Sequence, residues 1–333
     1  MEFQIIEQSD LNKLVVKRTG EVKLGERIRL VETDLLEELQ NSKAQFVLLG
    51  IPEDIGPRAN CGRGGADSAW QAFLPKFLNI QSTEELSGEE ILLLGNFDFS
   101  DLVGSGNSDL EKLRTAVSKI DEQLSGLIKL IVEAGKVPLI VGGGHNNSYG
   151  TIKGCSEALS QAINCINLDP HADYRALEGR HSGNGFSYAK AEGYLSHYSI
   201  LALHENYNSQ NMLEQMQQDG VQFSFYEDLF LRDSIPFTQA TQTALEKVKQ
   251  VKFGVELDCD SIENFPSSAQ TPSGISALQA RQYVYQCGKE KNAVYLHLPE
   301  AAPALEKGSE DLVGKMLAYL VSDFVKARKI NFL

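Results

Sequence analysis

The sequence predicts an α/β fold with a mainly parallel β-sheet of about eight strands and helices on both faces of the sheet. From about residue 45 onward, short apolar runs alternate with longer amphipathic segments, a pattern typical of βαβ units. No internal repeat, low-complexity tract or Pro/Ser-rich linker interrupts this alternation. We therefore expect residues 41–333 to form a single domain.

Each element is expected from its local pattern. The strands are short apolar runs at residues 45–51, 91–95, 137–141, 164–169, 198–203, 221–225, 252–258 and 292–298. The helices are amphipathic segments near residues 65–77, 108–135, 148–162, 236–250, 276–287 and 310–328.

Two segments have distinctive patterns. Between Asp109 and Ala134, apolar residues such as Leu113 and Val117 recur every three or four positions, so one face of this helix should pack on the sheet. Residues 1–40 do not follow the alternation. They are expected to be an amino-terminal extension, with a helix around residues 34–39.

Composition excludes several classes of partner. The 333 residues are 42% hydrophobic and 23% charged, as in ordinary soluble globular proteins. The net charge of −14 argues against a nucleic-acid or anionic-membrane surface, because phosphate binding needs clustered Lys and Arg. Small molecules or proteins are the expected partners, and the sequence leaves formation of a homo-oligomer open.

Cysteine usage and the amino terminus indicate a cytoplasmic protein. The five cysteines are odd in number and form no CxxC pair, which disfavours a disulfide framework and a zinc knuckle. No basic segment followed by a long apolar stretch stands at the amino terminus, so no signal peptide is expected. No segment has the length of a membrane span.

Metal-type side chains follow three of the expected strands. Residues 169–173 read Asp-Pro-His-Ala-Asp, and ligands at every second position can point to one side of an extended segment. Because parallel strands place their following loops at one edge of the sheet, these side chains should meet those that follow the other two strands. The six candidate ligands are His145, Asp169, His171, Asp173, Asp258 and Asp260. Six are too many for one four-coordinate zinc and suit two bridged divalent ions.

These three segments, in this order, resemble the ureohydrolase superfamily of arginases, agmatinases and formimidoylglutamases, over roughly residues 46–324. The resemblance implies an arginase-like three-layer sandwich and two Mn²⁺ ions held by the six side chains. The sequence departs from the family at Gly144, where an Asp usually stands, and at residues 263–264, where Asp-Pro often stands. The first departure is expected to remove a group that supports a ligand and to weaken metal affinity.

The resemblance also assigns candidate catalytic residues. Residues 300–306 resemble the family's Glu-x-x-Pro-x-x-Asp stretch, so Glu300 is expected to pair with the cationic substrate nitrogen. Ser182 stands where arginases and agmatinases carry a proton-shuttle His, as is typical of formimidoylglutamases. His181 lies next to it and is the alternative proton shuttle.

Candidate substrate contacts come from three segments. Arg175 is matched by Arg in formimidoylglutamases, and an Arg there can grip a substrate carboxylate in a bidentate manner. Asn184 lies in the same segment, and Thr271 lies in a loop that resembles one lining the family's pocket. Arg58 and Arg63 lie in a loop like that of formimidoylglutamases and are candidate carboxylate anchors, although either could be a surface arginine.

The resemblance implies a metal-dependent enzyme that hydrolyses a C–N bond at an amidine or formimino carbon. The first expectation is hydrolysis of N-formimidoyl-glutamate to glutamate and formamide, a step of histidine breakdown. A guanidine hydrolase acting on arginine, agmatine or a guanidino acid is the close alternative. A family member that has lost catalysis and serves as a binding or assembly protein is the second alternative.

Overall fold

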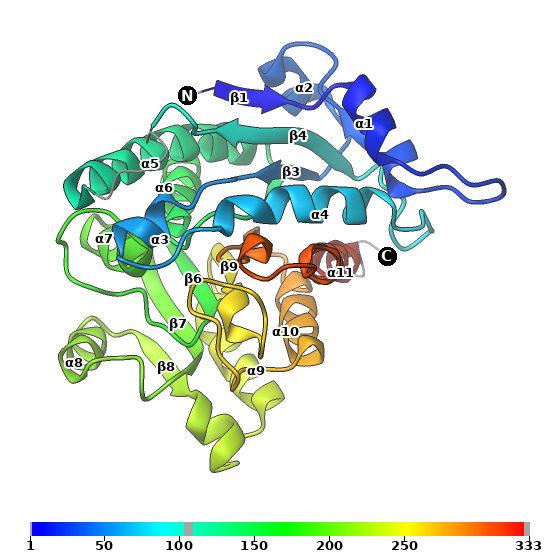
Figure 1. Cartoon of the computed structure of the whole chain (residues 1–333). Helices are drawn as coiled ribbons and strands as arrows, with labels where there is room; N and C mark the ends of the chain where they lie inside the picture. Colours follow the sequence, from blue (N-terminus) through cyan, green and yellow to red (C-terminus); the bar gives the residue numbers. More distant parts are fainter. Residues whose placement is uncertain (1, 103–108, 330–333) are drawn as a thin grey trace.

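The computed structural model describes residues 2–102 and 109–329, and a ten-stranded sheet forms its centre (Figure 1). The strand order is β1-β4-β3-β5-β10-β9-β6-β7-β8, and β2 also pairs with β4. β1 runs antiparallel to β4, and the other pairs are parallel. The strands are β1 Glu2–Ile5, β2 Arg29–Leu30, β3 Phe46–Gly50, β4 Ile91–Asp98, β5 Val137–Val141, β6 Ile163–Leu168, β7 Leu195–Leu203, β8 Gln222–Phe225, β9 Phe253–Leu257 and β10 Ala293–Leu298.

All eight expected strands are present, and the amino-terminal residues add two more. β1 pairs residue by residue with the carboxyl half of β4, from Glu2 opposite Asp98 to Ile5 opposite Gly95. β1 and β2 contain four and two residues, too few to give a recognisable alternation of side chains. Residues 1–40, which the sequence set apart from the alternation, thus contribute to one edge of the sheet.

The six expected helices are also present, together with shorter ones that the sequence did not indicate. α1, α3, α7 and α8 have five to nine residues, and such lengths give a weak periodic signal. α2 agrees with the helix expected around residues 34–39. The helices are α1 Gln8–Leu14, α2 Leu35–Asn41, α3 Ile55–Ala59, α4 Ala69–Leu78, α5 Leu110–Glu133, α6 Asn147–Leu159, α7 Gly185–Ala191, α8 Gln210–Gln218, α9 Phe237–Val248, α10 Ala277–Gly288 and α11 Glu310–Lys329.

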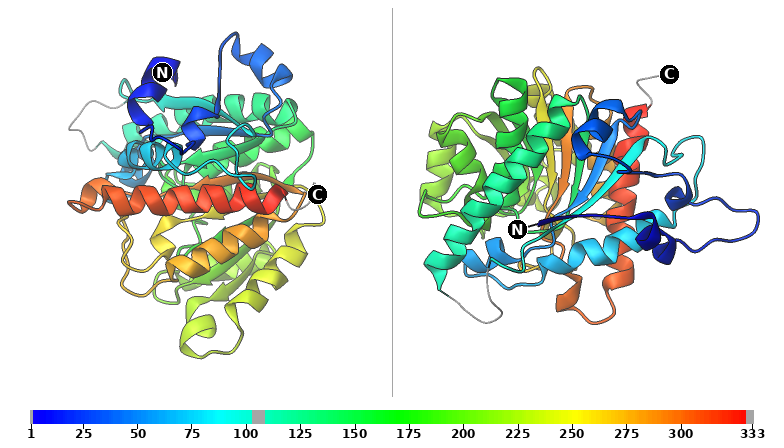
Figure 2. Two further views of the ribbon diagram at one scale, coloured as in Figure 1. Left: turned by 90° about the vertical axis from the view of Figure 1, so that its right-hand side faces the viewer. Right: turned by 90° about the horizontal axis from the view of Figure 1, so that it is seen from above.

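Helices cover both faces of the sheet, so the fold has the three layers expected (Figure 2). Strand residues alternate between the two apolar cores: Leu139 and Val141 belong to the core with α4, α10 and α11, whereas Ile140 belongs to the core with α5 and α6. The periodic apolar residues of α5, including Leu113 and Val117, are buried as expected. Within the described ranges, no helix combines the length and apolar character needed to cross a membrane.

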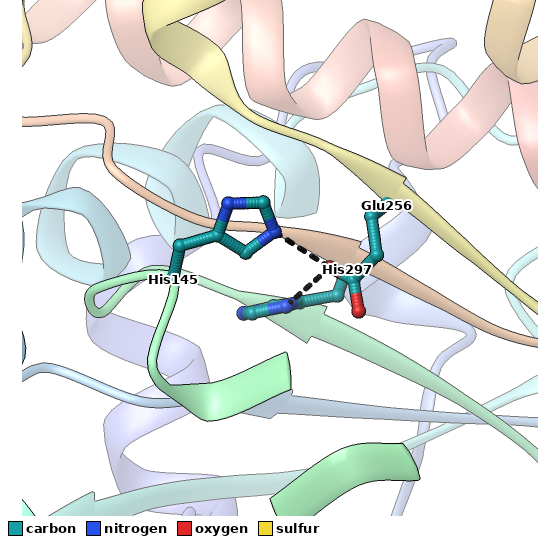
Figure 3. Close-up of side chains that lie close together, drawn as sticks. All are labelled: His145, Glu256 and His297. Carbon is teal, nitrogen blue, oxygen red and sulfur yellow. Dashed lines mark hydrogen bonds and ion pairs between the residues drawn. The ribbon is translucent and has the colours of Figure 1, made fainter. Parts of the chain in front are cut away.

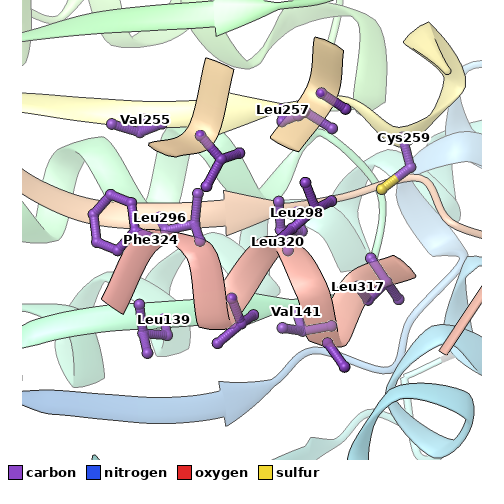
Figure 4. Packing of buried hydrophobic residues seen from close by; sticks show 14 of the residues in the cluster. Leu139, Val141, Val255, Leu257, Cys259, Leu296, Leu298, Leu317, Leu320 and Phe324 are labelled. Atoms are coloured by element: carbon purple, nitrogen blue, oxygen red, sulfur yellow. The ribbon is translucent and has the colours of Figure 1, made fainter. Parts of the chain in front are cut away.

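The core beside α11 fixes the ends of the central strands. Val141, Leu257 and Leu298 close β5, β9 and β10, and all three are fully buried in the same apolar cluster as Leu317 and Phe324 of α11 (Figure 4). The loops that carry His145, the pair Asp258 and Asp260, and Glu300 begin directly after these three residues. Apolar packing therefore fixes the point from which each of these loops starts.

We predict that Phe324→Ala will destabilise the fold beneath these loops. Phe324 is fully buried, and its ring lies 6.5 Å from that of Phe46 in β3. Truncation should lower the free energy of unfolding by about 3–5 kcal/mol because it removes buried contacts and leaves a cavity. Urea unfolding measures this change. The control is Leu312→Ala on the same helix, where the side chain is 71% exposed and the loss should stay within about 0.5 kcal/mol. Equal losses in both variants would contradict the packing described here.

Candidate metal centre

Four neighbouring strands carry polar side chains just beyond their carboxyl ends. β5, β10, β9 and β6 are adjacent in the sheet, so the loops that follow them meet at one edge. His145 follows β5 through a turn of three glycines, and Glu300 follows β10. The acidic residues 258 and 260 follow β9, and the Asp-Pro-His-Ala-Asp segment follows β6.

The first cluster surrounds one nitrogen of His145. Its Nδ1 lies 3.1 Å from Asp169 Oδ2, 2.9 Å from Asp173 Oδ2 and 3.0 Å from Asp258 Oδ2. The side chain of His145 is fully buried, and the three carboxylates are buried or nearly so. Candidate ligand atoms of these four residues all lie within 4.8 Å of one another.

The second cluster shares a carboxylate with the first. His171 Nδ1 lies 3.1 Å from Asp260 Oδ2 and 3.6 Å from Asp169 Oδ1. The two oxygens of Asp169 therefore face different imidazoles. The structure brings all six predicted ligands together, in two groups joined by Asp169.

Short loops and local hydrogen bonds aim these carboxylates. Asp173 and Glu300 adopt the left-handed backbone conformation, with φ of 47° and 64°, which is uncommon for residues other than glycine and often found at functional sites. Asp169 accepts hydrogen bonds from the backbone N–H of His171 at 2.7 Å and from Asn167 Nδ2 at 3.0 Å. Asp258 accepts one from the backbone N–H of Asp260 at 2.8 Å.

The crowded charges shift the pKa values of the candidate ligands. Burial raises the pKa of Asp258 well above its usual value, and the charges of Asp260 and Asp169 raise it further. Burial also raises the pKa of Asp173. Burial alone would lower the pKa of His145, but the carboxylates of Asp169, Asp173 and Asp258 beside its ring hold it well above its usual value. These carboxylates can therefore all be ionised only when positive charge lies beside them.

The donor set fits two divalent cations. His145 Nδ1 and Asp260 Oδ1 are buried and make no hydrogen bond. Unpartnered buried polar atoms are rare in folded proteins, and a metal ion would use both as ligands. Carboxylate oxygens with imidazole nitrogens suit hard or intermediate divalent ions, and the shared Asp169 could bridge a pair of them.

A cavity of about 510 Å³ opens beside the two clusters. Besides four of the candidate metal ligands, three residues that the sequence predicted for catalysis or substrate binding line it: Arg175, Ser182 and Glu300. Glu300 Oε1 accepts a hydrogen bond from the backbone N–H of His145 at 2.9 Å, which ties this carboxylate to the first cluster. Burial raises the pKa of Glu300 well above its usual value, and the charge of Asp258 adds to the effect.

The cavity also has polar walls that the sequence analysis did not identify. Its remaining polar lining comes from the segment after α3, the loop after β7 and the loop after β9, including Asn60, Tyr207, Asn208, Ser209 and Ser268. The ring of Tyr207 stacks on His171, with centroids 5.1 Å apart and an interplanar angle of 16°. No local motif marks these residues. In the sequence, Tyr207 stands out only as an aromatic residue shortly after a predicted strand, and this is weak evidence for a place in a binding site.

Two of the predicted arginines do not line this cavity. Arg58 pairs with Asp54 at 3.2 Å and lines a separate acidic cavity together with Glu53 and Asp67. Arg63 donates hydrogen bonds to the carbonyl oxygens of residues 267 and 268. Its visible role is to hold the loop that contributes Ser268 to the cavity wall.

Two predicted substrate-binding residues, Asn184 and Thr271, also lie outside the cavity lining. Asn184 is fully buried and bonds the backbone of its own loop, at His181 N and at the carbonyl oxygens of Ala176 and Gly179. Thr271 is buried, and its hydroxyl lies 3.4 Å from the Tyr207 hydroxyl. The amide of Asn184 therefore shapes the loop rather than facing the cavity.

His181 is also enclosed, next to Ser182. Its Nδ1 accepts the N–H of Gly183 at 3.1 Å, and its Nε2 lies 3.2 Å from Glu178 Oε1. Burial lowers the pKa of His181 to about 4, although the contact with Glu178 opposes the shift. The imidazole is thus neutral near pH 7 and has no surface on the cavity.

Gly144 has a steric reason to lack the usual aspartate. A Cβ at this position would lie 2.3 Å from Pro57 Cδ and 2.5 Å from Asn146 Oδ1. The buried carboxylate next to this position comes from another segment. Glu53 Oε1 accepts one hydrogen bond from the backbone N–H of Gly144 at 2.8 Å and one from the side-chain amide of Asn147 at 2.7 Å. Glu53 was not predicted, since it is more than ninety residues away in the sequence.

Comparison with known proteins places this geometry in a family. The model of the arginase family matches residues 44–322. The chain belongs to the arginase family. Relatives of this arginase-family chain include formimidoylglutamases of Streptococcus pyogenes, one 28% identical over 246 residues, covering 71% of this chain and 68% of the relative. Another is 26% identical over 290 residues, covering 83% and 84%.

Solved structures share the arginase fold. The formimidoylglutamase of Bacillus subtilis superposes with a TM-score of 0.76 at 19% identity, covering 95% of this chain and 94% of that one. The formiminoglutamase of Trypanosoma cruzi, crystallised with Mn²⁺, gives 0.74 at 20% identity, covering 92% and 98%. Together with the family match, these relatives identify the protein as a hydrolase of C–N bonds in amidines. An inactive binding protein is therefore not the best description of the chain.

We predict that divalent metal uptake strengthens as the pH rises. The raised pKa values of Asp173, Asp258 and His145 mean that these groups hold protons at pH values where free side chains have lost them. Protons and metal compete for the same atoms, so lowering the pH weakens binding by about tenfold per pH unit for each proton displaced. Calorimetric titration of metal-free protein with Mn²⁺ between pH 6 and 8.5 measures the slope. A dissociation constant independent of pH would contradict this account.

We also predict that His181→Gln leaves the acid and alkaline limits of the activity profile unchanged between pH 6 and 9. The folded pKa of about 4 lies below the usual 6.5, so His181 stays neutral across that range and cannot produce either limit. The stability that depends on neutral His181 is present above pH 6.5 and is lost as the pH falls toward 4. Initial rates at saturating metal give the profile. A limit that moves by a full pH unit would assign the titration to His181.

Proposed function

We propose that the protein hydrolyses N-formimidoyl-glutamate to glutamate and formamide, as in histidine breakdown, with two Mn²⁺ ions at the six-residue centre. The observation that carries the proposal is the position of Arg175, which lines the same cavity as His171, Asp173, Asp258 and Asp260. The names of the relatives from Streptococcus pyogenes agree with it. The volume of about 510 Å³ is in the range of small-molecule sites.

The metal ligands would divide between the two clusters. His145, Asp173 and Asp258 would hold one ion and His171 and Asp260 the other, with Asp169 shared. When bound, the ions would supply Lewis acidity and a hydrolytic water of lowered pKa. Manganese is favoured over copper because the donor set is rich in carboxylates.

Glu300 would hold the reacting group in place. Its carboxylate lies on the cavity wall, with one oxygen bonded to the His145 N–H and the other 3.4 Å from Ser268 Oγ. The formimino group of the substrate is cationic when protonated and planar. A carboxylate fixed in this way can pair with its N–H groups and orient its carbon toward the metal ligands.

Arg175 would bind a substrate carboxylate at the mouth of the cavity. Its side chain is 51% exposed, and its guanidinium donates to Asn60 Oδ1 at 3.0 Å and to Glu178 Oε1 at 2.8 Å. These two contacts hold the planar group against the cavity wall. The neutral donors Asn60 and Ser209 also line the cavity and could hold the second carboxylate of formimidoyl-glutamate.

A guanidino-acid hydrolase is the second candidate, and one observation favours it. Among the described residues that line the cavity, Arg175 is the one arginine or lysine. A guanidino acid has one carboxylate, whereas formimidoyl-glutamate has two. The solved arginase-fold structures also include the proclavaminate amidino hydrolase of Streptomyces clavuligerus, with a TM-score of 0.67 at 19% identity.

We predict that Arg175→Ala raises the KM for formimidoyl-glutamate by roughly ten- to a hundredfold, because it removes a charge-assisted contact worth about 1.5–3 kcal/mol. Arg175→Lys should recover part of the loss, since it keeps the charge without the planar fork. Released glutamate, urea and putrescine are measured with manganese-loaded protein against formimidoyl-glutamate, arginine, agmatine and guanidino acids.

The matched control is Arg27→Ala, an arginine of similar exposure that pairs with Glu89 on the surface. It should leave KM and metal content unchanged. Preference of the parent protein for a guanidino acid would select the second candidate. Preference for agmatine, which has no carboxylate, would overturn both assignments.

A further inference from the structure

Two buried polar side chains lie behind the first metal cluster, next to the ring of His145 and outside the cavity lining. Glu256 is in β9 and His297 is in β10, and both are fully buried, as is His145 (Figure 3). Burying a carboxylate among strands costs free energy unless hydrogen bonds compensate for it. None of the three side chains contributes to the cavity wall. Contact with the substrate therefore does not explain why these polar side chains are buried together.

Glu256 receives donors on both of its oxygens. Oε1 accepts the hydroxyl of Tyr295 at 2.7 Å, and Oε2 lies 2.7 Å from His297 Nδ1. The same Oε2 lies 3.4 Å from His145 Nε2. The carboxylate is thus held in place by two residues of the neighbouring strand and directed at the ring of His145 (Figure 3).

The two nitrogens of His145 consequently face different surroundings. Nδ1 faces the carboxylates of Asp169, Asp173 and Asp258, and Nε2 faces Glu256. A neutral imidazole carries one proton, and the nitrogen that binds a metal must be free of it. The proton then resides on Nε2, where burial leaves it in need of an acceptor. Neither ring nitrogen makes a hydrogen bond to another group in the described structure.

We propose that Glu256 is a positioning residue for the metal centre: its carboxylate accepts the Nε2 proton of His145, so that the ring presents Nδ1 to the first metal ion. Tyr295 and His297 hold Glu256 in place for this purpose. Such outer contacts fix the tautomer and orientation of a histidine ligand, and their loss typically costs ten- to a hundredfold in metal affinity. The proposal rests on the metal centre of the proposed function.

The contacts of Glu256 allow a role in positioning His145 to be distinguished from a role in packing the strands. Glu256 contacts His145, whereas Tyr295 bonds the other oxygen of the same carboxylate and has no polar contact with His145. Glu256→Gln and Tyr295→Phe therefore both disturb the buried group, but the first removes the carboxylate that faces the ligand. A role limited to packing would affect the two variants alike.

Manganese binding to the metal-free parent and to both variants tests the proposal, with urea unfolding of each to measure stability. Glu256→Gln should bind one Mn²⁺ with parental affinity and the second ten- to a hundredfold more weakly, with an electron paramagnetic resonance spectrum of isolated rather than coupled ions. Tyr295→Phe should bind two ions within about threefold of the parent. The proposal would be overturned if Glu256→Gln bound two ions with parental affinity. It would also be overturned if metal binding weakened in both variants in proportion to their loss of stability.

A measurement on the parent protein covers the case in which Glu256→Gln does not fold. In protein loaded with diamagnetic Zn²⁺ and labelled with ¹⁵N-histidine, long-range ¹H–¹⁵N correlation should show His145 protonated at Nε2, with its signals identified by their absence in His145→Asn. Protonation at Nδ1 would overturn the proposal. A parent that binds no divalent ion would overturn the proposed metal centre as well, whereas two ions in both the parent and Glu256→Gln would overturn this inference alone.

Discussion

Repulsion among buried carboxylates is the constraint on which the centre depends. Asp169, Asp173, Asp258 and Asp260 follow two adjacent strands and share a small volume with two imidazoles. Burial raises the pKa of Asp258, and its acidic neighbours raise it further. Such a group stays compact when cations neutralise it. The strands beneath must resist the repulsion, and their fully buried ends lie in the apolar core that also contains residues of α11.

Two buried glutamates lie against His145 and the turn that presents it. Glu53 accepts hydrogen bonds from Gly144 and Asn147 and so shapes this turn. Glu256 lies behind the ring of His145, held by Tyr295 and His297. Position 144 carries no side chain, and both glutamates come from other segments of the chain. Ligand geometry in this centre is a property of the packed sheet rather than of one loop.

The cavity is assembled differently from the metal clusters. Its floor consists of side chains at strand ends, whereas Asn60, Arg175 and Tyr207 come from three separate loops. Hydrogen bonds among loop residues, such as Arg175 to Asn60, set the shape of the opening. Substitution of loop residues can therefore change which substrate fits without altering the ligands below. A fold shared with formimidoylglutamases and an amidino hydrolase is consistent with this separation of roles.

The sequence by itself determined the fold class, the eight central strands and the six candidate ligands. Apolar runs and their spacing are local properties, and ligands such as Asp169, His171 and Asp173 are marked by a motif within five residues. Tertiary structure alone decided which polar residues face the cavity. Arg58 and Arg63 are close to Asn60 in the sequence, yet of the three only Asn60 lines the cavity, because the arginines are held by Asp54 and by backbone carbonyls. The pairing of β1 with β4 and the approach of Glu53 to Gly144 join residues ninety or more positions apart. Such contacts depend on how the layers pack, and no local pattern in the chain encodes them.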